Sequence, residues 1–368
     1  MSLEKNTPIL QRRSLVVQVA DVLLQDLRSG KWVGELPGEN ALAERLQVSR
    51  FTIRAALDML RREGLISRVQ GRPTLITAKA RTLRQPASTR AIGFLSTEPL
   101  HALSPAILYR IAEMRRHLQD NGYHLDLHLG LQRRGPHLLA NLARLIRHAR
   151  ADCWVLHLST PEIQRWFMEH DVPTIVSGSC YEGIDLPFLE IDRRAVCRHA
   201  AGLFLGLGHR RVALLTVEDK AAGDIAGEQG FREGFEKSPH RDAEPIVRYH
   251  DGTMPGLRAA LTSLMRSKSP PSGVLIARSM YVFAAMGHLM NAGYRIPRDV
   301  SVISRDDDSY LAFAEPSIAR YRVNVRGFGR RLLRMVLQMA TLGSVTPRQN
   351  WVMAQYCEGK SLGPYQPS

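Results

Sequence analysis

Apolar side chains recur every three or four positions near the start of the chain, which is the spacing of an amphipathic helix. This pattern predicts a helix over residues 15–29 that ends at Gly30. Two more helices are predicted over 39–46 and 50–63, with Ser49 between them as the N-cap of the second. Three short helices of this length form a compact bundle only if their apolar faces meet.

Two short runs of strand character, at 65–69 and 74–77, follow the third helix around a turn at 70–73. Adjacent strands joined by a tight turn form a hairpin. The first module is therefore predicted to be a winged helix: a helix, a helix-turn-helix and a β-wing, of α+β class. Residues 79–90 are polar and basic and predict an exposed linker, which makes 1–78 a domain of its own.

Strand and helix patterns alternate from residue 91 onward. This alternation predicts parallel β-sheets with helices on both faces, and the 278 residues after position 90 exceed one comfortable doubly wound sheet. We therefore expect an α/β domain of two lobes over 91–368, with any ligand in the cleft where the strands end. The strand patterns cover 91–95, 123–129, 153–158, 173–176, 212–217, 246–249, 273–277 and 300–304; the helical ones cover 104–121, 136–148, 160–170, 193–207, 226–237, 255–267 and 280–292.

Positive charge is concentrated in the first quarter of the chain. The whole chain has a formal charge of +15, of which +8 lies in residues 1–90 and +7 in the rest. A basic module favours a polyanionic partner, because each neutralised phosphate releases a counterion. On charge alone, a generally basic composition explains the excess equally well.

Several classes of protein do not match this composition. No stretch approaches the ~20 apolar residues of a membrane helix, and the start of the chain has no apolar core of signal-peptide length. The four cysteines are scattered, which fits a reducing cytoplasm and gives no metal-site spacing. Common catalytic and nucleotide-binding motifs are missing. We therefore expect a cytoplasmic protein that is not an enzyme and has no catalytic residues, no metal site, no cofactor and no membrane partner.

The second helix of the helix-turn-helix has the polar groups that a DNA-reading helix needs. Such a helix enters the major groove, and arginine pairs with guanine edges or phosphates at two points. The alternative is a winged helix that contacts proteins instead of DNA. The candidate DNA contacts are Glu39, Ser49, Arg50, Thr52, Arg54 and, at the wing, Gln70, Gly71 and Arg72.

The stretch LPGENALAERLQVSRFTIRAALDMLRREGLI, at 36–66, resembles the winged helix of gluconate-repressor (GntR-type) transcription factors. The resemblance covers about 65 residues and implies operator DNA as a partner. Two positions depart from the family pattern: Asn40 stands where many relatives carry arginine, and Pro73 replaces the second glycine of the wing. Because proline fixes φ and has no N–H, a reshaped wing tip is expected.

The large domain is similar to the effector domain of lactose/galactose-repressor (LacI-type) regulators, which is built like periplasmic sugar-binding proteins. The segments LGHRRVALLT, at 207–216, and IPRDVSVISRDD, at 296–307, carry the resemblance most specifically. It implies one lobe of 91–209 with 323–342 and another of 211–318 with 345–368. It also implies lobe closure on a ligand and a homodimer that matches the two-fold symmetry of operator half-sites.

The resemblance also implies where a ligand would bind. At several family positions the chain departs: Gly178 and Gly227 stand where an Asp or Arg and an Arg are expected, and Arg278-Ser279 replaces an Asn-Asp pair. Arg305 replaces the aromatic residue before Asp306, whose family counterpart accepts sugar hydroxyls. The candidate ligand residues are Ser96, Thr97, Glu98, His101, Ser104, Arg278, Arg305 and Asp306.

These departures leave three interpretations of the cleft open. A neutral sugar needs paired polar groups and an aromatic face. Arg278 and Arg305 instead suit an acidic or phosphorylated sugar through two-point contacts. In the third interpretation the arginines pair internally with Asp306, Asp307 or Asp308 and no small ligand binds. The sequence thus predicts a sequence-specific transcription regulator, a repressor of a carbohydrate-related operon controlled by a small effector; the alternative is a DNA-binding protein whose large domain only dimerises.

Overall fold

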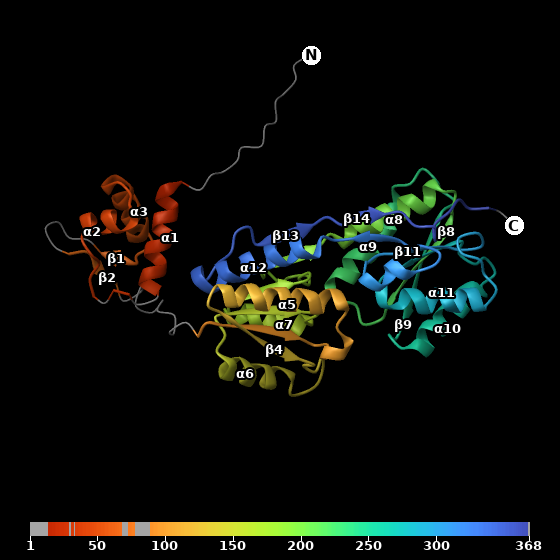
Figure 1. Cartoon of the computed structure of the whole chain (residues 1–368), viewed down its shortest axis with the longest axis horizontal. Helices are drawn as coiled ribbons and strands as arrows, with labels where there is room; N and C mark the ends of the chain where they lie inside the picture. The colour runs from red at the N-terminus through yellow and green to blue at the C-terminus, as the bar shows by residue number, and fades with distance from the viewer. Residues whose placement is uncertain (1–13, 29–30, 33, 68–72, 78–88, 367–368) are drawn as a thin grey trace, which may run out of the picture. The chain divides into compact units, whose positions relative to one another are not determined.

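The computed structural model describes residues 14–28, 31–32, 34–67, 73–77 and 89–366 (Figure 1). It divides into two compact units, 1–89 and 90–368. The predicted wing tip at 70–72 and most of the predicted linker lie outside the described residues. In the part of the chain that is described, no helix is long and apolar enough to cross a membrane.

The first unit is a small helical bundle with a two-stranded sheet. Its core includes Leu23, Leu42 and Ile53, which are fully buried. The strands pair antiparallel in the register Ile66 to Ile76. Its elements are α1 (Leu15–Arg28), α2 (Glu39–Leu46), α3 (Arg50–Arg62), β1 (Ile66–Ser67) and β2 (Leu75–Ile76). All three helices begin at the predicted residue and end within one residue of it. The left-handed Gln47 ends α2, Ser49 caps the start of α3, and Gly64, with a positive φ, follows the end of α3.

The second unit contains two six-stranded sheets, each covered by helices on both faces. The first sheet has the order β13-β7-β6-β5-β3-β4, and all of its pairings are parallel. Helices α5 and α12 pack on one face, and α6 and α7 pack on the other. The elements are β3 (Ala91–Ser96), η1 (Leu100–Ala102), α5 (Pro105–Asp120), β4 (His124–Leu129), α6 (Leu138–Ala149), β5 (Cys153–His157), α7 (Pro161–Glu169), β6 (Thr174–Ser177), β7 (Phe188–Ile191), α12 (Val325–Leu342) and β13 (Gln349–Val352).

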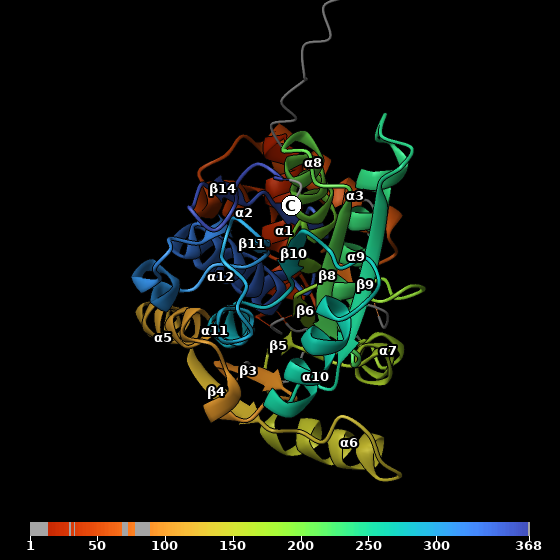
Figure 2. The ribbon, with the colours of Figure 1, turned by 90° about the vertical axis from the view of Figure 1, so that its right-hand side faces the viewer.

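The second sheet has the order β14-β12-β11-β10-β8-β9 and is parallel except for the pair β12 and β14. Helices α8 and α9 pack on one face, and α10 and α11 pack on the other. Figure 2 shows this sheet with α9 and α10 beside β8 and β9. The elements are α8 (Arg193–Gly206), β8 (Arg211–Val217), α9 (Ala222–Glu236), β9 (Glu244–His250), α10 (Met254–Met265), β10 (Gly273–Ile276), η2 (Ser279–Tyr281), α11 (Val282–Asn291), β11 (Ser301–Ser304), η3 (Ser309–Phe313), β12 (Ala319–Arg322) and β14 (Gln355–Cys357).

The chain crosses between the lobes at places that differ from the expected ones. Helix α8 packs against the second sheet, although residues up to 209 were expected in the first lobe. Strand β13 pairs with β7 of the first sheet, although residues after 345 were expected in the second lobe. The crossovers therefore follow β7, β12 and β13. Pairing partners and the packing of a helix are long-range choices, so the local patterns used for the expectation do not contain them.

Candidate DNA-binding and effector sites

The start of α3 is organised by its N-cap. The hydroxyl of Ser49 accepts a hydrogen bond from the backbone N–H of Thr52 at 3.1 Å, and the two hydroxyl oxygens lie 2.8 Å apart. Thr52, which was named as a candidate DNA contact, is buried. Its hydroxyl therefore shapes the helix terminus.

Two side chains at this terminus face solvent. Arg50 is exposed, and the adjacent Phe51 is 81% exposed, which is unusual for so large an apolar side chain. One turn later, Arg54 forms an ion pair with Glu39 of α2 at 3.0 Å. The hydrogen bond that Arg54 donates to Glu39 raises the pKa of Arg54, so this guanidinium stays charged and is tied to the preceding helix. Sequence reasoning named Arg50, Arg54 and Glu39 but missed Phe51, whose only signal was an apolar residue off the buried helical face.

The predicted residues from the first strand of the large domain fall into two groups. Ser96 and Thr97 are buried at the end of β3, and their hydroxyls shape the loop: Ser96 accepts from the N–H of Glu98 at 3.1 Å, and Thr97 donates to the carbonyl of Leu158 at 2.7 Å. Glu98 lies 3.4 Å from Arg133. His101 is exposed on η1, and Ser104 is the N-cap residue of α5.

The predicted arginines lie at the ends of strands in the second sheet, and both contact Asp224 in the first turn of α9. Arg305 donates to its Oδ1 at 2.8 Å, and Arg278 donates to its Oδ2 at 3.1 Å. Asp224 and Arg305 are almost fully buried, whereas the side chain of Arg278 is 24% exposed. Burial would raise the pKa of Asp224, but Arg305 and Arg278 outweigh it and hold that pKa below the usual range. The arginines do pair internally: both bind Asp224, which was not considered from sequence, and Arg305 also lies 3.5 Å from Asp306, one of the three aspartates that were.

A second ion pair adjoins the first. Arg193, the first residue of α8, donates to Oδ1 of Asp306 at 2.5 Å, and Arg305 lies 3.5 Å from the other carboxylate oxygen. Burial raises the pKa of Asp306, but the charges of Arg193 and Arg305 lower it further, so the net shift is downward. Glu190, at the end of β7, lies 3.7 Å from Arg193. Asp306 is thus engaged by two arginines, which leaves it poorly placed to accept sugar hydroxyls.

Arg305 takes up the space beside one of the glycines. A Cβ built on Gly227 would lie 3.2 Å from a terminal nitrogen of Arg305. The family arginine expected on α9 is therefore replaced in space by a guanidinium that reaches in from the end of β11. In the sequence, Gly227 and Arg305 are two separate departures from the family pattern, because these positions are neighbours only in the folded chain.

Two residues that sequence reasoning missed lie among these charges. His157, at the end of β5, is buried, and burial together with the charges of Arg110, Arg193 and Arg278 lowers its pKa to about 3. Arg110 comes from α5, and its guanidinium lies 4.6 Å from the ring centre of Phe328. Burial lowers the pKa of Arg110 to about 10, and the charges that act on it, which include Glu190, Arg193 and Asp306, come from both lobes. In the sequence, the only feature that could have drawn attention to Arg110 was its position within the predicted helix over 104–121.

Loops of the two lobes also make direct contact. Asp219, which follows β8, lies 3.0 Å from Arg133 and 3.2 Å from Arg134, both in the loop after β4. Nearby, the hydroxyl of Tyr181 donates to the carbonyl of Lys220 at 3.4 Å. These contacts hold the strand-end edges of the two sheets opposite each other.

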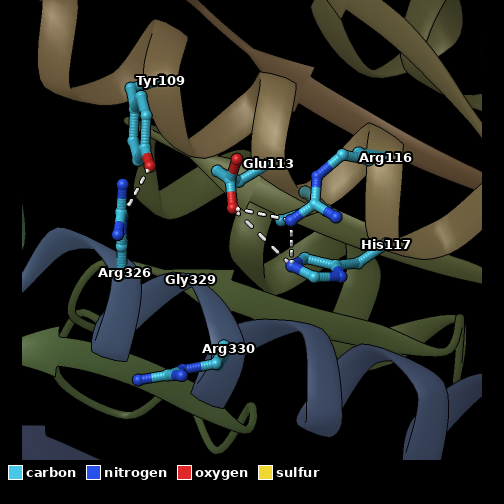
Figure 3. Close-up of a pocket in the computed structure, with 8 residues that line it drawn as sticks. Tyr109, Glu113, Arg116, His117, Arg326, Gly329 and Arg330 are labelled. Atoms are coloured by element: carbon cyan, nitrogen blue, oxygen red, sulfur yellow. Dashed lines mark hydrogen bonds and ion pairs between the residues drawn. The ribbon is translucent and has the colours of Figure 1, made fainter.

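A separate surface pocket lies between α5 and α12 (Figure 3). Arg326 donates to the hydroxyl of Tyr109 at 3.1 Å, and Glu113 neutralises Arg116 at 3.2 Å. The pocket contains none of the residues predicted for the effector site. Among the described residues, no group of histidine, cysteine, aspartate and glutamate could hold a metal ion.

Comparison with known families separates the chain into the same two parts. Residues 15–76 match the family of bacterial regulatory proteins called the gntR family, and residues 201–362 match a periplasmic binding protein-like domain. Neither match alone spans half of the chain. Together they agree with the winged-helix motif and with the sheet topology of the second unit.

Individual relatives are transcription regulators. The chain is 26% identical over 160 residues to the regulator CelR of Thermobifida fusca, covering 44% of this chain and 47% of CelR. It is 22% identical over 325 residues to the arabinose metabolism transcriptional repressor of Geobacillus stearothermophilus, covering 84% of this chain and 86% of that protein. The chain spans about half the length of most such relatives. A solved structure of a CelR–cellobiose complex, 19% identical, superposes with a TM-score of 0.65 over 89% of this chain and all of that one, which shows a shared fold.

Proposed function

We propose that this chain, which joins a gntR-family domain to a periplasmic binding protein-like domain, is a DNA-binding transcription regulator controlled by a small effector. The observation that carries the proposal is the start of α3, where Arg50 and Phe51 project from a capped helix of a winged-helix unit. A helix end that projects polar and apolar groups in this way can enter a major groove. One relative is an arabinose metabolism transcriptional repressor and one similar structure is a CelR–cellobiose complex, which favours repression of a carbohydrate-related operon.

Selection of bound duplexes from a random DNA library, followed by fluorescence anisotropy, tests the DNA-binding part. We expect one recurrent sequence with two half-sites and an affinity that falls steeply as salt rises, because phosphate contacts release counterions. Recovery of no preferred sequence would overturn the proposal and would favour a winged helix that contacts proteins.

The two-lobed unit supplies the proposed control. An effector that closes the lobes would change the operator affinity only by the factor by which the affinity for the effector itself differs between the open and the closed state. In the alternative, the large domain serves only for dimerisation and the internal ion pairs replace a ligand. A ligand that both raises the Tm and alters the operator affinity supports the sensor, and its absence across a broad panel supports the alternative.

We also propose that the protein acts as a homodimer, in the cytoplasm where bacterial DNA lies, and has no enzymatic activity. The second unit exposes large apolar side chains on α5 and α11. Figures 1 and 2 show these two helices on the same side of that unit. Exposed apolar surface of this kind marks a protein interface. These residues are Leu108, Tyr109, Phe283 and Met290, with Met280 and Phe313 in the neighbouring short helices.

Sedimentation of the full chain checks the dimer. We expect a dimer for the wild-type protein and a monomer for Phe283→Lys, because an ammonium group would be buried without a partner in the interface. Arg232→Lys on α9 is the matched surface control and is expected to remain dimeric. A wild-type monomer at micromolar concentration would contradict the assignment.

A further inference from the structure

We propose that the pocket between α5 and α12 is a second small-molecule site, which binds a small phosphorylated compound. The pocket shares no residue with the cleft between the lobes, so this inference goes beyond the proposed function, which needs only one effector site. Its volume is about 380 Å³. Ligand pockets range from about 300 to 1,000 Å³, so this one has room for a compound of the size of a sugar phosphate.

Two helices of the first lobe form the pocket (Figure 3). Helix α5 forms one wall and α12 the other, and on α12 Gly329 lies between the two lining arginines. A Cβ built on Gly329 would meet nothing within 4 Å, so open space lies beside this position and a ligand can approach the helix closely. The lining residues are Tyr109, Glu113, Met114, Arg116 and His117 of α5 and Arg326, Gly329 and Arg330 of α12.

Cations outnumber anions in this pocket. Arg116, Arg326 and Arg330 line it, against the single carboxylate of Glu113, which leaves two positive charges in excess. Helix α12 adds no carboxylate, because its sequence contains neither aspartate nor glutamate. Asp120 of α5 lies beyond the lining residues, 3.9 Å from Arg116. When Asp120 is counted as well, one positive charge still remains in excess.

The arginines of the pocket use only some of their donors within the chain. Arg326 donates from Nε to the hydroxyl of Tyr109 at 3.1 Å. Arg116 donates to Glu113 at 3.2 Å and to Nε2 of His117 at 2.9 Å, so the imidazole accepts at Nε2. Since a guanidinium has five N–H donors, most of the donors of both arginines remain available to a ligand.

Arg330 is the cation that the chain leaves uncompensated. Its side chain is exposed, and among the residues that the structure describes it has no hydrogen-bond or ion-pair partner. It lies about one helical turn after Arg326, on the same side of α12. Two neighbouring guanidinium groups can bind one phosphate by paired, charge-assisted hydrogen bonds. A phosphate in the pocket would therefore give Arg330 the partner that it lacks.

The charge excess favours phosphate over other ligands. A phosphate monoester carries about −1.5 to −2 near pH 7 and has three strong acceptor oxygens, which matches an excess of one to two positive charges. A carboxylate carries at most one negative charge, and a neutral sugar carries none. A DNA duplex also presents phosphates, but a rigid double helix does not enter a pocket of this size.

The position of α12 in the chain connects this pocket to the movement of the lobes. Strand β12 before this helix and strand β14 after β13 belong to the second sheet, so α12 and β13 lie between two crossovers. A ligand that bridges α5 and α12 stiffens the segment between these crossovers and thereby changes the balance between open and closed lobes. This regulatory part rests on the proposed function, whereas the phosphate site itself does not.

Calorimetric titration of the full chain, at an ionic strength held constant with chloride, tests the site. The probes are glycerol with glycerol 3-phosphate, D-ribose with ribose 5-phosphate, and D-glucose with glucose 6-phosphate; D-gluconate represents carboxylates. We expect at least one phosphorylated probe to bind, and its neutral parent and gluconate to bind about tenfold more weakly or worse, because they lose charge-assisted hydrogen bonds. Equal binding of a phosphate and its parent, tighter binding of gluconate, or silence of every phosphorylated probe would overturn the inference.

Two arginine variants locate the site. Arg330→Gln is expected to weaken the active phosphate by about tenfold or more, the loss for one charge-assisted hydrogen bond, and to leave the Tm without ligand unchanged. Arg147→Gln is the matched control, because Arg147 is exposed on α6, on the opposite face of the same sheet, and has no partner among the described residues. Its phosphate affinity is expected to equal that of the wild-type protein. Wild-type affinity in Arg330→Gln, or an equal loss in both variants, would contradict the assignment.

A third variant fills the pocket and leaves its charges in place. Gly329→Leu is expected to keep or raise the Tm without ligand, because a Cβ has space there and leucine favours helix over glycine. The same variant is expected to bind the active phosphate about tenfold more weakly or worse, because the side chain occupies the volume of the ligand. A folded Gly329→Leu protein with wild-type phosphate affinity would place the ligand elsewhere.

Sedimentation and operator binding separate this inference from the proposed function. Tyr109 belongs both to the pocket and to the proposed dimer face. If Arg330→Gln becomes monomeric and the wild-type protein binds no phosphate, the pocket holds an acidic side chain of a second copy and the phosphate site is overturned. An operator affinity that does not change with the bound phosphate overturns only the regulatory part. A protein that binds phosphate but no duplex overturns the proposed function and leaves this site intact.

Discussion

Neighbouring residues at the start of α3 face opposite environments. Arg50 and Phe51 are exposed, whereas Thr52 and Ile53 are buried. The 100° step of a helix explains this change, and it also explains why a run of polar letters does not identify a contact surface. The exposed pair projects from the end of the helix where DNA-reading helices contact base edges.

Arg50→Ala is expected to weaken operator binding by about 1–3 kcal/mol, which is the loss from one base or phosphate contact. Arg54→Ala is expected to weaken operator binding by an amount that varies with salt concentration, because the guanidinium of Arg54 is already paired with Glu39. Fluorescence anisotropy with the selected duplex measures both, and effector binding serves as the control that must not change. Unaltered affinity in both variants would show that α3 is not the reading helix.

Phe51→Ala is expected to leave the stability of the first unit unchanged, because the ring is 81% exposed and has little packing to lose. If the ring contacts a thymine methyl group, the variant loses affinity mainly for duplexes with that base pair, by about 1 kcal/mol. The measurement is a comparison of selected sequences for the wild-type and variant proteins. Identical sequence preference would remove Phe51 from the interface.

Helices α8 and α9 pack unusually closely, and glycine makes this possible. A Cβ on Gly230 would lie 2.0 Å from the carbonyl oxygen of Arg194, and one on Gly234 would lie 2.6 Å from the Cβ of Ala201. Close approach of these helices also places Arg193 beside Gly223, the residue before Asp224, where an added Cβ would lie 2.9 Å from the Cδ of Arg193.

Gly230→Ala is expected to destabilise the second unit by about 1–3 kcal/mol or more, because the clash is with backbone and cannot be relieved by a rotamer change. Gly202→Ala is the matched control on α8: its Cβ meets nothing within 4 Å, and alanine favours helix by up to about 1 kcal/mol. Urea unfolding measures both. A stabilised Gly230→Ala protein would show that the helices lie farther apart.

Acid sensitivity is a property of the second unit as a whole, since it sums over buried groups in both lobes. His157 has a native pKa of about 3 against about 6.5 when unfolded, so between these values the unfolded chain binds the proton and the native protein does not. Stability from this group therefore falls as pH falls below about 6.5. The lowered pKa of Asp224 acts in the same direction at lower pH, because protonating it in the native state is unfavourable.

When the pH falls from 7 to 5, the free energy of unfolding of His157→Gln is expected to decrease by about 2 kcal/mol less than that of the wild-type protein. One proton contributes about 1.4 kcal/mol per pH unit. His124→Gln, at an exposed site on β4, is the control and is expected to follow the wild-type curve. Urea midpoints of the second unit at the two pH values provide the measurement. Parallel pH dependence of wild type and His157→Gln would mean that the imidazole is protonated in the native state.

Local periodicity and capping in the sequence were enough to predict the winged helix, the alternation of strands and helices and the presence of two lobes. Helices such as 39–46 were predicted to the residue, because hydrophobic spacing and end signals act over a few positions. The candidate cleft was predicted only in part: Arg278, Arg305 and Asp306 do lie at strand ends, but the partner of both arginines, Asp224, was not identified.

Only the tertiary structure decided which lobe receives α8 and β13, and which carboxylate each arginine binds. The ion pairs depend on contacts between residues 54 to 113 positions apart, such as Arg278 with Asp224 and Arg193 with Asp306. Strand β13 pairs with residues of β7 that lie 161 positions earlier in the chain. A side chain looks the same in a sequence whether its charge is neutralised, buried or free, because pairing depends on distance in space. For this protein, that distance separates the buried Arg305 from Arg278, which shares its partner Asp224 but has a side chain that is 24% exposed.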